Sequence, residues 1–253
     1  MWSTARLPFE ATGDLLRLRT TLRAALRNMA AQPGAGLLAT YAAPDKAFVD
    51  VENVLLYNVG AASYGHLLSA GLVCRRVPGA DNRHHMRYET VSPLPEPDPG
   101  AIQVLAEVDA PLSRLPATAG EWWAALRPYA DLAARTAADP TSFVLDVRLE
   151  CPATERRRLA GMIKSMLDGL VSVFHAHDGS NEIGLYGRVD GLGEHAVAWS
   201  LLCDPSANVL GTRTLVRPYR AGIMWNPVDD RCSAFRVGII PGPGRRLSAR
   251  LLS

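Results

Sequence analysis

The stretch SFVLDVRLE, residues 142–150, alternates between apolar and polar side chains, which is the two-residue period of a β-strand with one buried face. After Pro152 the period changes, and residues 154–177 carry apolar side chains every three or four positions, as an amphipathic helix does. A strand and a helix that each have one apolar side must bury those sides against each other. The expected helix seam consists of Leu159, Met162, Ile163, Met166, Leu170, Val173 and Phe174.

The rest of the chain mixes the same two periods. Residues 14–31 predict a second amphipathic helix with its arginines in solvent, and residues 120–138 predict a third, which Pro128 interrupts. Further strands are predicted at residues 36–43, 48–60, 71–77, 84–91, 102–110, 182–189, 195–203, 210–217 and 233–240. We therefore predict an α+β fold with a largely antiparallel mixed sheet that is packed by two or three long helices.

Turn-forming residues separate the first strands in pairs. Residues 44–46 join strand 36–43 to strand 48–60, and residues 78–82 join strand 71–77 to strand 84–91, so both pairs are predicted to form hairpins. No segment has the length or composition of a linker, and we treat residues 1–253 as a single globular domain. The proline-rich stretch 93–100 is the best alternative boundary.

Composition narrows the partners. The chain has 27 Lys and Arg against 25 Asp and Glu, a net charge of +2, which provides no overall field to attract nucleic acid. No run of about 18 apolar residues predicts a membrane span. The four cysteines form no CxxC pair, and the N-terminal residues lack the apolar core of a secretion signal, so we expect a reduced, cytoplasmic protein. Whether it forms a homo-oligomer stays open.

Several cofactor motifs are missing from the sequence. It contains no GxGxxG after a strand, no GxxxxGK[ST] loop, no HExxH and no GxSxG elbow, so we expect chemistry without a cofactor. The stretch HAHD at residues 175–178 is the one grouping typical of a metal site. On a continuous helix His175 and His177 point about 200° apart, which favours two histidines that cap a helix end over two metal ligands. No metal is therefore predicted.

The stretch FVDVENVLLYNVG, residues 48–60, resembles a core strand but carries two carboxylates and two amides. Read as a strand, Asp50, Glu52 and Asn58 share one face, while the other face carries Val51, Asn53, Leu55, Tyr57 and Val59. A buried carboxylate without a partner costs several kcal/mol or stays protonated. The polar side chains are therefore expected to lie on a wet face or to line a site, with Val51, Leu55 and Val59 buried.

The strand HHMRYETV, residues 84–91, carries a second polar group. Its period places His85, Arg87 and Glu89 on one face, and Tyr88 on the other, while the expected hairpin partner contributes Arg75 or Arg76. Arginine can hold a carboxylate through two parallel hydrogen bonds, and glutamate can transfer a proton, so the group is typical of a site for an anionic substrate. The alternative is an exposed ladder of salt bridges across a hairpin.

The first 90 residues resemble a known enzyme family. The Arg-bearing N-terminal helix, DVENVLLYNVG, GLVCRRV and HHMRYE follow one another as in the cofactor-independent Pictet–Spenglerases of bacterial β-carboline biosynthesis, the marinacarboline type. The resemblance implies a glutamate as acid/base, for which Glu89 is the first candidate. It also implies that an arginine and a histidine hold the aldehyde, and Arg76 and His85 are the nearest candidates.

The predicted function is therefore a cofactor-free acid/base condensation of a tryptophan-like aromatic amine with an aldehyde. Glu89 is predicted to be catalytic, with Glu52 as the next carboxylate, and the predicted substrate-binding residues are Arg76, His85, Arg87, Asn58 and Tyr88. Two alternatives stay open. Scattered carboxylates at Asp50, Glu52, Asp168 and Asp178 could serve a metal-dependent enzyme that processes nucleic acid, and the same pocket could belong to a non-catalytic protein that binds a small ligand.

Overall fold

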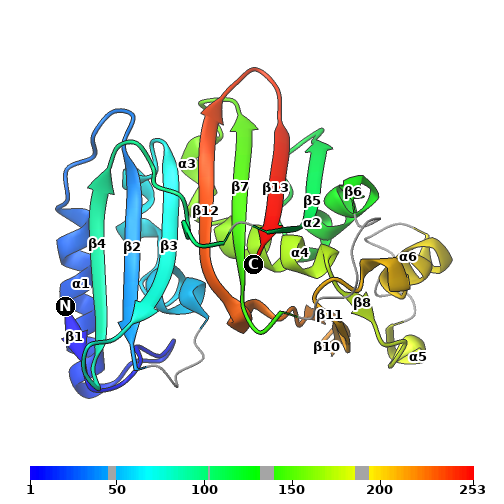
Figure 1. Cartoon of the computed structure of the whole chain (residues 1–253), viewed down its shortest axis with the longest axis horizontal. Helices are drawn as coiled ribbons and strands as arrows, with labels where there is room; N and C mark the ends of the chain where they lie inside the picture. Colours follow the sequence, from blue (N-terminus) through cyan, green and yellow to red (C-terminus); the bar gives the residue numbers. More distant parts are fainter. Residues whose placement is uncertain (45–49, 102, 132–139, 186–193) are drawn as a thin grey trace.

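A nine-stranded sheet runs through the protein (Figure 1). The computed structural model describes residues 1–44, 50–101, 103–131, 140–185 and 194–253. The strands follow the order β1 (Trp2–Ser3), β4 (His84–Val91), β2 (Gly36–Ala43), β3 (Gly71–Pro78), β12 (Cys232–Pro241), β7 (Phe143–Cys151), β13 (Arg246–Leu252), β5 (Val104–Pro111) and β6 (Ala130–Asp131). Only β2 with β3 and β7 with β12 pair in parallel among these described strands. The α+β class with a mostly antiparallel mixed sheet is thus confirmed.

Helices cover one face of this sheet, and the other face is open (Figure 1). The covering helices are α1 (Gly13–Arg27), α2 (Ala119–Leu126), α3 (Arg156–Leu159) and α4 (Ile163–Val173). They are shorter than predicted, and α1 is the longest of those described, with 15 residues. The segment between β4 and β5 crosses the open face, where Glu96 pairs with Arg236 of β12 at 2.9 Å. No helix of the described residues is long and apolar enough to cross a membrane.

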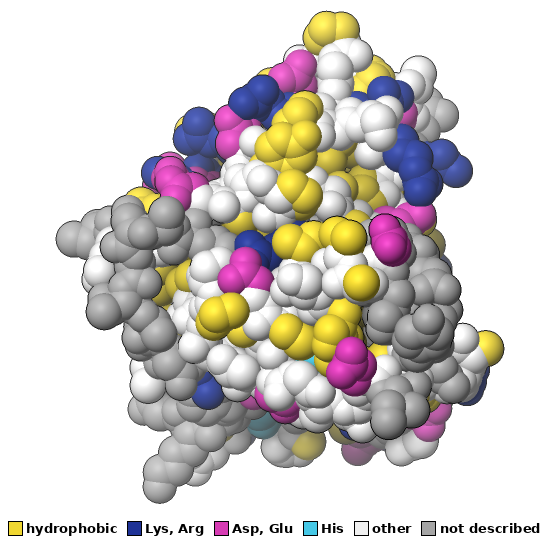
Figure 2. Space-filling model, turned by 90° about the vertical axis from the view of Figure 1, so that its right-hand side faces the viewer, with side chains coloured by type: hydrophobic (Ala, Val, Ile, Leu, Met, Phe, Trp, Pro, Cys, Tyr) yellow, Lys and Arg dark blue, Asp and Glu magenta, His cyan; other side chains and the backbone are white. Residues whose placement is uncertain are grey.

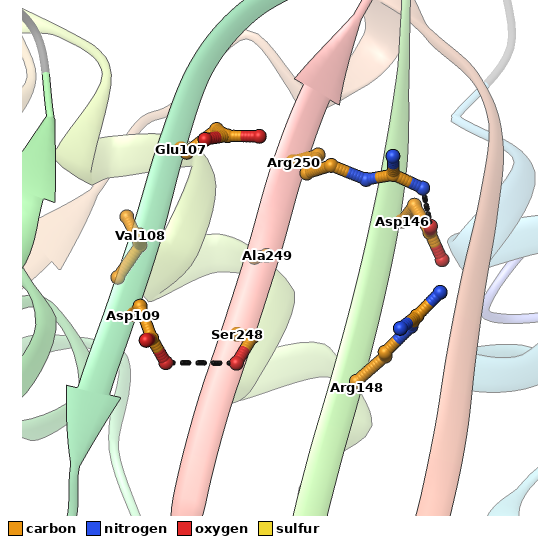
Figure 3. A pocket seen from close by; sticks show the side chains of 8 residues that line it. All are labelled: Glu107, Val108, Asp109, Asp146, Arg148, Ser248, Ala249 and Arg250. Carbon is orange, nitrogen blue, oxygen red and sulfur yellow. Dashed lines mark hydrogen bonds and ion pairs between the residues drawn. The ribbon is translucent and has the colours of Figure 1, made fainter.

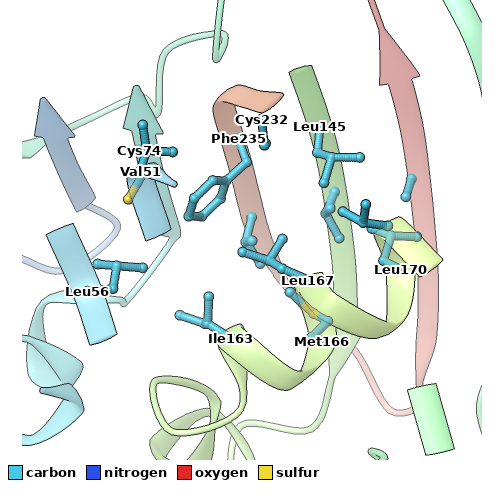
Figure 4. Close-up of a cluster of buried hydrophobic side chains, with 14 of the residues drawn as sticks. Val51, Leu56, Cys74, Leu145, Ile163, Met166, Leu167, Leu170, Cys232 and Phe235 are labelled. Carbon is cyan, nitrogen blue, oxygen red and sulfur yellow. The ribbon is translucent and has the colours of Figure 1, made fainter. Parts of the chain in front are cut away.

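The core lies between the sheet and the helices (Figure 4). The predicted seam packs as expected, because Leu159, Ile163, Met166 and Leu170 are at most 4 % exposed. The helix itself is interrupted: α3 ends at Leu159, α4 ends at Val173, and residues Ala176–His177 form the short strand β8. The strand at 142–150 is also confirmed as β7, with its apolar residues on the core face.

Residues 48–60 do not form a strand, and this prediction is wrong for the part that the structure describes, which begins at Asp50. The chain is helical from Val51, and Asn53–Tyr57 forms a π-helix in which Asn58 N donates to Asn53 O at 2.9 Å. Asp50 accepts a hydrogen bond from Asn53 N at 3.0 Å, which satisfies a free donor of the first turn. The run is apolar on nearly every side, so a buried helix and a buried strand cannot be told apart by its period.

The two predicted hairpins are also wrong: the first lacks its second strand, since residues 51–57 are helical, and in the second β2 lies between β3 and β4. The helical segment after Asp50 is a crossover that returns the chain to the start of the sheet, so β3 runs parallel to β2. Strand β4 then pairs with the free side of β2, with Tyr41 opposite Met86. The polar residues of β4 are thereby separated from β3 by a whole strand.

The region after α4 contains more helix than predicted. Residues 182–189 and 195–203 were predicted as strands, but they include helices α5 (Glu182–Leu185) and α6 (His195–Leu202), while residues 186–193 lie outside the described part. Stretch 210–217 gives only the short strands β9 (Thr212–Arg213) and β10 (Val216–Tyr219), the latter paired with β11 (Gly222–Trp225). The predicted helix 120–138 ends at Leu126 as α2, and its last residues, 132–138, lie outside the described part. The strand at 233–240 is confirmed in β12.

Helices α2 and α4 pack at a glycine. A Cβ atom added at Gly169 would lie 2.5 Å from Ala119 O and 2.5 Å from Trp122 Cβ, so Gly169→Ala is expected to force the two helices apart. The expected loss of unfolding free energy is about 1–3 kcal/mol, which urea denaturation measures. Gly161→Ala is the control, because its nearest atom is Arg158 O at 3.6 Å. Equal stability of the two variants would contradict this close packing.

Candidate functional site

Lys164 of α4 lies among carboxylates from separate segments of the chain. Its Nζ lies 3.1 Å from Glu52 Oε2, 3.3 Å from Asp168 Oδ1 and 3.8 Å from Asp229 Oδ2. Asp50 completes the group, since it shares a side-chain hydrogen bond with Asp229. We call these five residues the Lys164 cluster.

The local sequence explains how each member reaches the cluster. Glu52 lies in the first helical turn after Asp50, directly before the π-helix. Asp168 follows Lys164 by four residues on α4, so the two side chains share one helix face. Asp229 begins a short 3₁₀ turn, Asp229–Arg231, that leads into β12. The cluster therefore joins the N-terminal crossover, the helical layer and the start of a central strand.

Burial controls the electrostatics of the cluster. Glu52 is 7 % exposed, and Leu145, Leu167 and Phe235 line the small cavity on its inner side. Desolvation raises the pKa of Glu52 to about 8, although the ammonium group of Lys164 opposes this shift. Burial also raises the pKa values of Asp168 and Asp229. Burial therefore favours the protonated form of the Glu52 carboxyl group near neutral pH.

Lys164 stays charged, because the attraction of the surrounding carboxylates outweighs its own desolvation and raises its pKa above the ordinary value. Its side chain is 29 % exposed, so the cluster is open to solvent on one side. Two aromatic rings lie there: the ring of Tyr57, with its centroid 5.7 Å from Lys164 Nζ, and the ring of Phe9, stacked on Tyr57 at 5.2 Å. Both aromatic residues are exposed.

The pKa of Glu52 predicts how stability depends on pH. The native state keeps a proton on Glu52 that the unfolded chain releases near the ordinary glutamate pKa of 4.5. The bound proton stabilises the native state fully below that pH, and the stabilisation is lost as the pH rises through about 8. Unfolding free energy is therefore expected to fall, on the order of a few kcal/mol, between pH 5.5 and 8.5. Glu52→Gln should flatten the slope in urea denaturation series, and an unchanged slope would contradict the shift.

The charged residues predicted on β4 form exposed ion pairs. Arg87 Nη2 donates to Glu89 Oε1 at 2.7 Å, and His85 Nε2 lies 3.0 Å from Asp81 Oδ1, with all four side chains well exposed. Both pairs lie within β4 and the turn before it, so they are exposed ion pairs but not the ladder across a hairpin that was the alternative for this strand. Glu89 points to the opposite face of the sheet from its neighbour Tyr88, which contacts Leu55 of the crossover segment.

The other predicted binding residues lie on the covered side. Tyr88 donates to Leu55 O at 2.8 Å, Asn58 Nδ2 donates to Leu7 O at 2.8 Å, and Arg76 Nη2 donates to Pro44 O at 3.2 Å. Burial raises the pKa of the Tyr88 hydroxyl well above its ordinary value. The Tyr88 contact ties the crossover segment to the sheet, and the Asn58 contact ties it to the N-terminal segment. Glu89 does not share a contact with Glu52 among the described residues.

A shallow pocket of about 290 Å³ lies on the open face, over β5, β13 and β7 (Figure 3). Asp146 on its floor accepts two hydrogen bonds from Arg236, at 2.7 and 2.8 Å, and one from Arg250 at 2.6 Å. Burial alone would raise the pKa of Asp146, but these arginines outweigh it and hold the pKa below its ordinary value. The charges of this face thus neutralise one another.

His175 and His177 are buried and do not act as helix caps. His175 Nδ1 donates to Gly211 O at 2.9 Å and its Nε2 accepts from Val228 N at 3.3 Å. His177 Nδ1 accepts from Leu215 N at 3.0 Å, and its Nε2 donates to Ser180 O at 2.9 Å. Both rings therefore hold the segment after α6 in place. Within the described ranges, no group of three or more His, Cys, Asp or Glu side chains is arranged to hold a metal ion.

The surface seen from the side of α6 carries mixed charge (Figure 2). In the upper part of that view, basic and acidic side chains lie side by side, with apolar side chains exposed between them.

Comparison with protein-family models, curated proteins and solved structures finds no match for the chain. The fold and the site therefore define the protein by themselves: an α+β protein whose helical layer contains a cluster of four carboxylates around one lysine. Sequence reasoning selected Glu52 but missed Lys164 and Asp229. One signal was available, because Lys164 is one of only two lysines in the chain.

Proposed function

We propose that the protein is a small-molecule enzyme that performs cofactor-free acid/base chemistry at the Lys164 cluster. The observation that carries the proposal is the buried Glu52 carboxyl group, whose pKa is raised to about 8 while it lies 3.1 Å from a charged ammonium group. A carboxyl group with a pKa near the working pH can both give and take a proton. Side chains with strongly perturbed pKa values cluster at functional sites, which supports the proposal.

The reaction that we propose is a Pictet–Spengler-type condensation of an aromatic amine with an aldehyde. The amine adds to the carbonyl carbon and gives a hydroxyl-bearing intermediate. Neutral Glu52 protonates this hydroxyl group, which leaves as water, and an iminium ion results. The aromatic carbon then attacks the iminium carbon. The Glu52 carboxylate removes the ring proton, which restores the neutral carboxyl group of Glu52. Lys164 would polarise the carbonyl oxygen, and the carboxylates of Asp168 and Asp229 would stabilise the cationic intermediate.

Product mass tests this reaction directly. Incubation with tryptamine or tryptophan and a small aldehyde should give a product whose mass equals the sum of the substrates minus one water. A ligand-binding protein would bind the same compounds without forming the product. The four free cysteines fit the proposed reduced, cytoplasmic setting. The assay should therefore contain a reductant.

The metal-dependent alternative has one supporting observation, because Asp50, Glu52 and Asp168 do come together. Asp178 does not join them, since it bonds to Ser180 and Thr214. The ammonium group of Lys164 also occupies the position between the carboxylates that a divalent cation would take. Turnover that disappears with a chelator and returns with Mg²⁺ would favour this alternative.

A further inference from the structure

A second concave site lies in the helical layer, away from the Lys164 cluster carboxylates. It is a groove of about 560 Å³ between the segment that follows the π-helix and the segment around α3. Its lining includes Ala61, Ala62, His66, Ser69, Arg156 and Ala160. We call it the Arg156 groove. Its volume is in the range of small-molecule sites, and small side chains at its walls keep it open.

The described residues that line this groove include Arg156 and His66 and no Asp or Glu. His66 also ties the groove wall to the chain just after α1, because its Nε2 donates to Met29 O at 3.1 Å.

Arginines of the helical layer differ in their partners: Arg17 of α1 pairs with Asp14, whereas Arg19, Arg23 and Arg156 form no ion pair with a described residue. Arg19 donates to Phe9 O and Arg23 to Val59 O, both at 2.5 Å, so their contacts are backbone carbonyls that carry no full charge. Arg156 forms no ion pair with any described residue, and its Nε is buried without a hydrogen-bond partner. An arginine guanidinium with free donors is the side chain best suited to bind the oxygens of a phosphate or a carboxylate.

The ring of His66 adds an acceptor. Its Nε2 donates to Met29 O, so Nδ1 of the neutral ring can accept a hydrogen bond from a hydroxyl group of the ligand. The hydroxyl group of Ser69 lies in the same lining and accepts only a long hydrogen bond, 3.4 Å, from Gly34 N. We propose that the Arg156 groove binds a small molecule through a phosphate or carboxylate group, with Arg156 as the principal contact and His66 and Ser69 as secondary contacts.

Isothermal titration calorimetry with inorganic pyrophosphate and with citrate tests the proposal without any turnover, so its outcome is independent of the proposed reaction. Saturable binding of either probe supports the site: pyrophosphate alone indicates a phosphate ligand, and citrate alone a carboxylate ligand. Arg156→Gln should weaken binding at least tenfold. Arg217→Gln, which removes an exposed arginine of β10, is the matched control and should change affinity less than twofold.

Ala62→Trp provides a second test that keeps every charge. Ala62 is exposed at the groove wall, so the indole should fill the groove without disturbing the core, and binding should again weaken at least tenfold. Melting temperatures check that both variants fold. Absence of binding by both probes would overturn the proposal. Equal weakening by Arg156→Gln and Arg217→Gln, or normal binding by Ala62→Trp, would overturn it too, since each indicates diffuse attraction to the surface.

Discussion

Glu52→Gln is expected to lower turnover by about 10²–10⁴-fold, the usual loss when a general acid/base is removed. The amide of Gln can still accept the hydrogen bond from Lys164, so the shape of the site should persist while proton transfer is lost. The melting temperature at pH 6 should change little, because Glu52 is largely neutral there, with a pKa of about 8. Steady-state kinetics with an amine and an aldehyde, together with thermal melting, measure both effects.

Glu89→Gln is the matched control for this prediction. It makes the same chemical change at an exposed carboxylate whose partner is Arg87, 2.7 Å away on the open face of the sheet. Turnover should stay within twofold of the natural protein. If Glu89→Gln abolished turnover and Glu52→Gln did not, the acid/base residue would lie on β4, and the Lys164 cluster would be a structural ion-pair group.

The pH profile separates a catalytic role of Glu52 from a structural one. In the natural protein kcat/KM should show a limb near the pKa of Glu52, about 8. This limb should disappear in the residual activity of Glu52→Gln. A variant that merely loosened the site would retain the limb with a lower maximum.

The strand β7 and the helix α4 could be predicted from the sequence because their side chains follow one period over many residues. SFVLDVRLE has a single apolar face, and the seam from Leu159 to Phe174 has one as well, so local pattern and tertiary burial agree. Residues 50–59 offered no such face. Val54, Leu55 and Leu56 are consecutive and all buried, and only the crossover topology makes that segment helical.

The site could be predicted only in part for a related reason. Glu52 attracted attention because a carboxylate in an apolar run needs a partner. That partner, Lys164, is 112 residues away, and Asp229 is farther still, so no local pattern connects them. The charged residues of β4 were the more visible motif, because His85, Arg87 and Glu89 are close in sequence, but their ion pairs are local and exposed.

Asp146→Asn is expected to produce the largest loss of stability, about 3 kcal/mol, because it leaves buried arginine charge without its carboxylate. Asp146 is 2 % exposed and accepts hydrogen bonds from Arg236 and Arg250, so it neutralises two guanidinium groups at the centre of the sheet. Asparagine keeps the volume but removes the charge and replaces one of the two acceptor oxygens with an NH2 group, which cannot accept from the arginines. Urea denaturation measures the change in unfolding free energy.

Asp109→Asn makes the same change at a carboxylate on the same face. Asp109 also accepts two hydrogen bonds from one arginine, Arg246, but its side chain is 53 % exposed, and water can take the place of the lost charge. No measurable change in unfolding free energy is expected for this control. A similar loss in both variants would mean that paired geometry, rather than burial, makes the Asp146 network stabilising.

A third variant decides why Asp146→Asn destabilises. If the cost arises from the uncompensated guanidinium of Arg236, then removing that charge as well, in Asp146→Asn with Arg236→Met, should recover part of the loss. Arg236 also pairs with Glu96 of the segment that crosses the open face, at 2.9 Å, so the double variant releases that contact and the recovery should be incomplete. A double variant less stable than Asp146→Asn alone would show that Arg236 still stabilises the sheet through Glu96, and that this crossing segment depends on it.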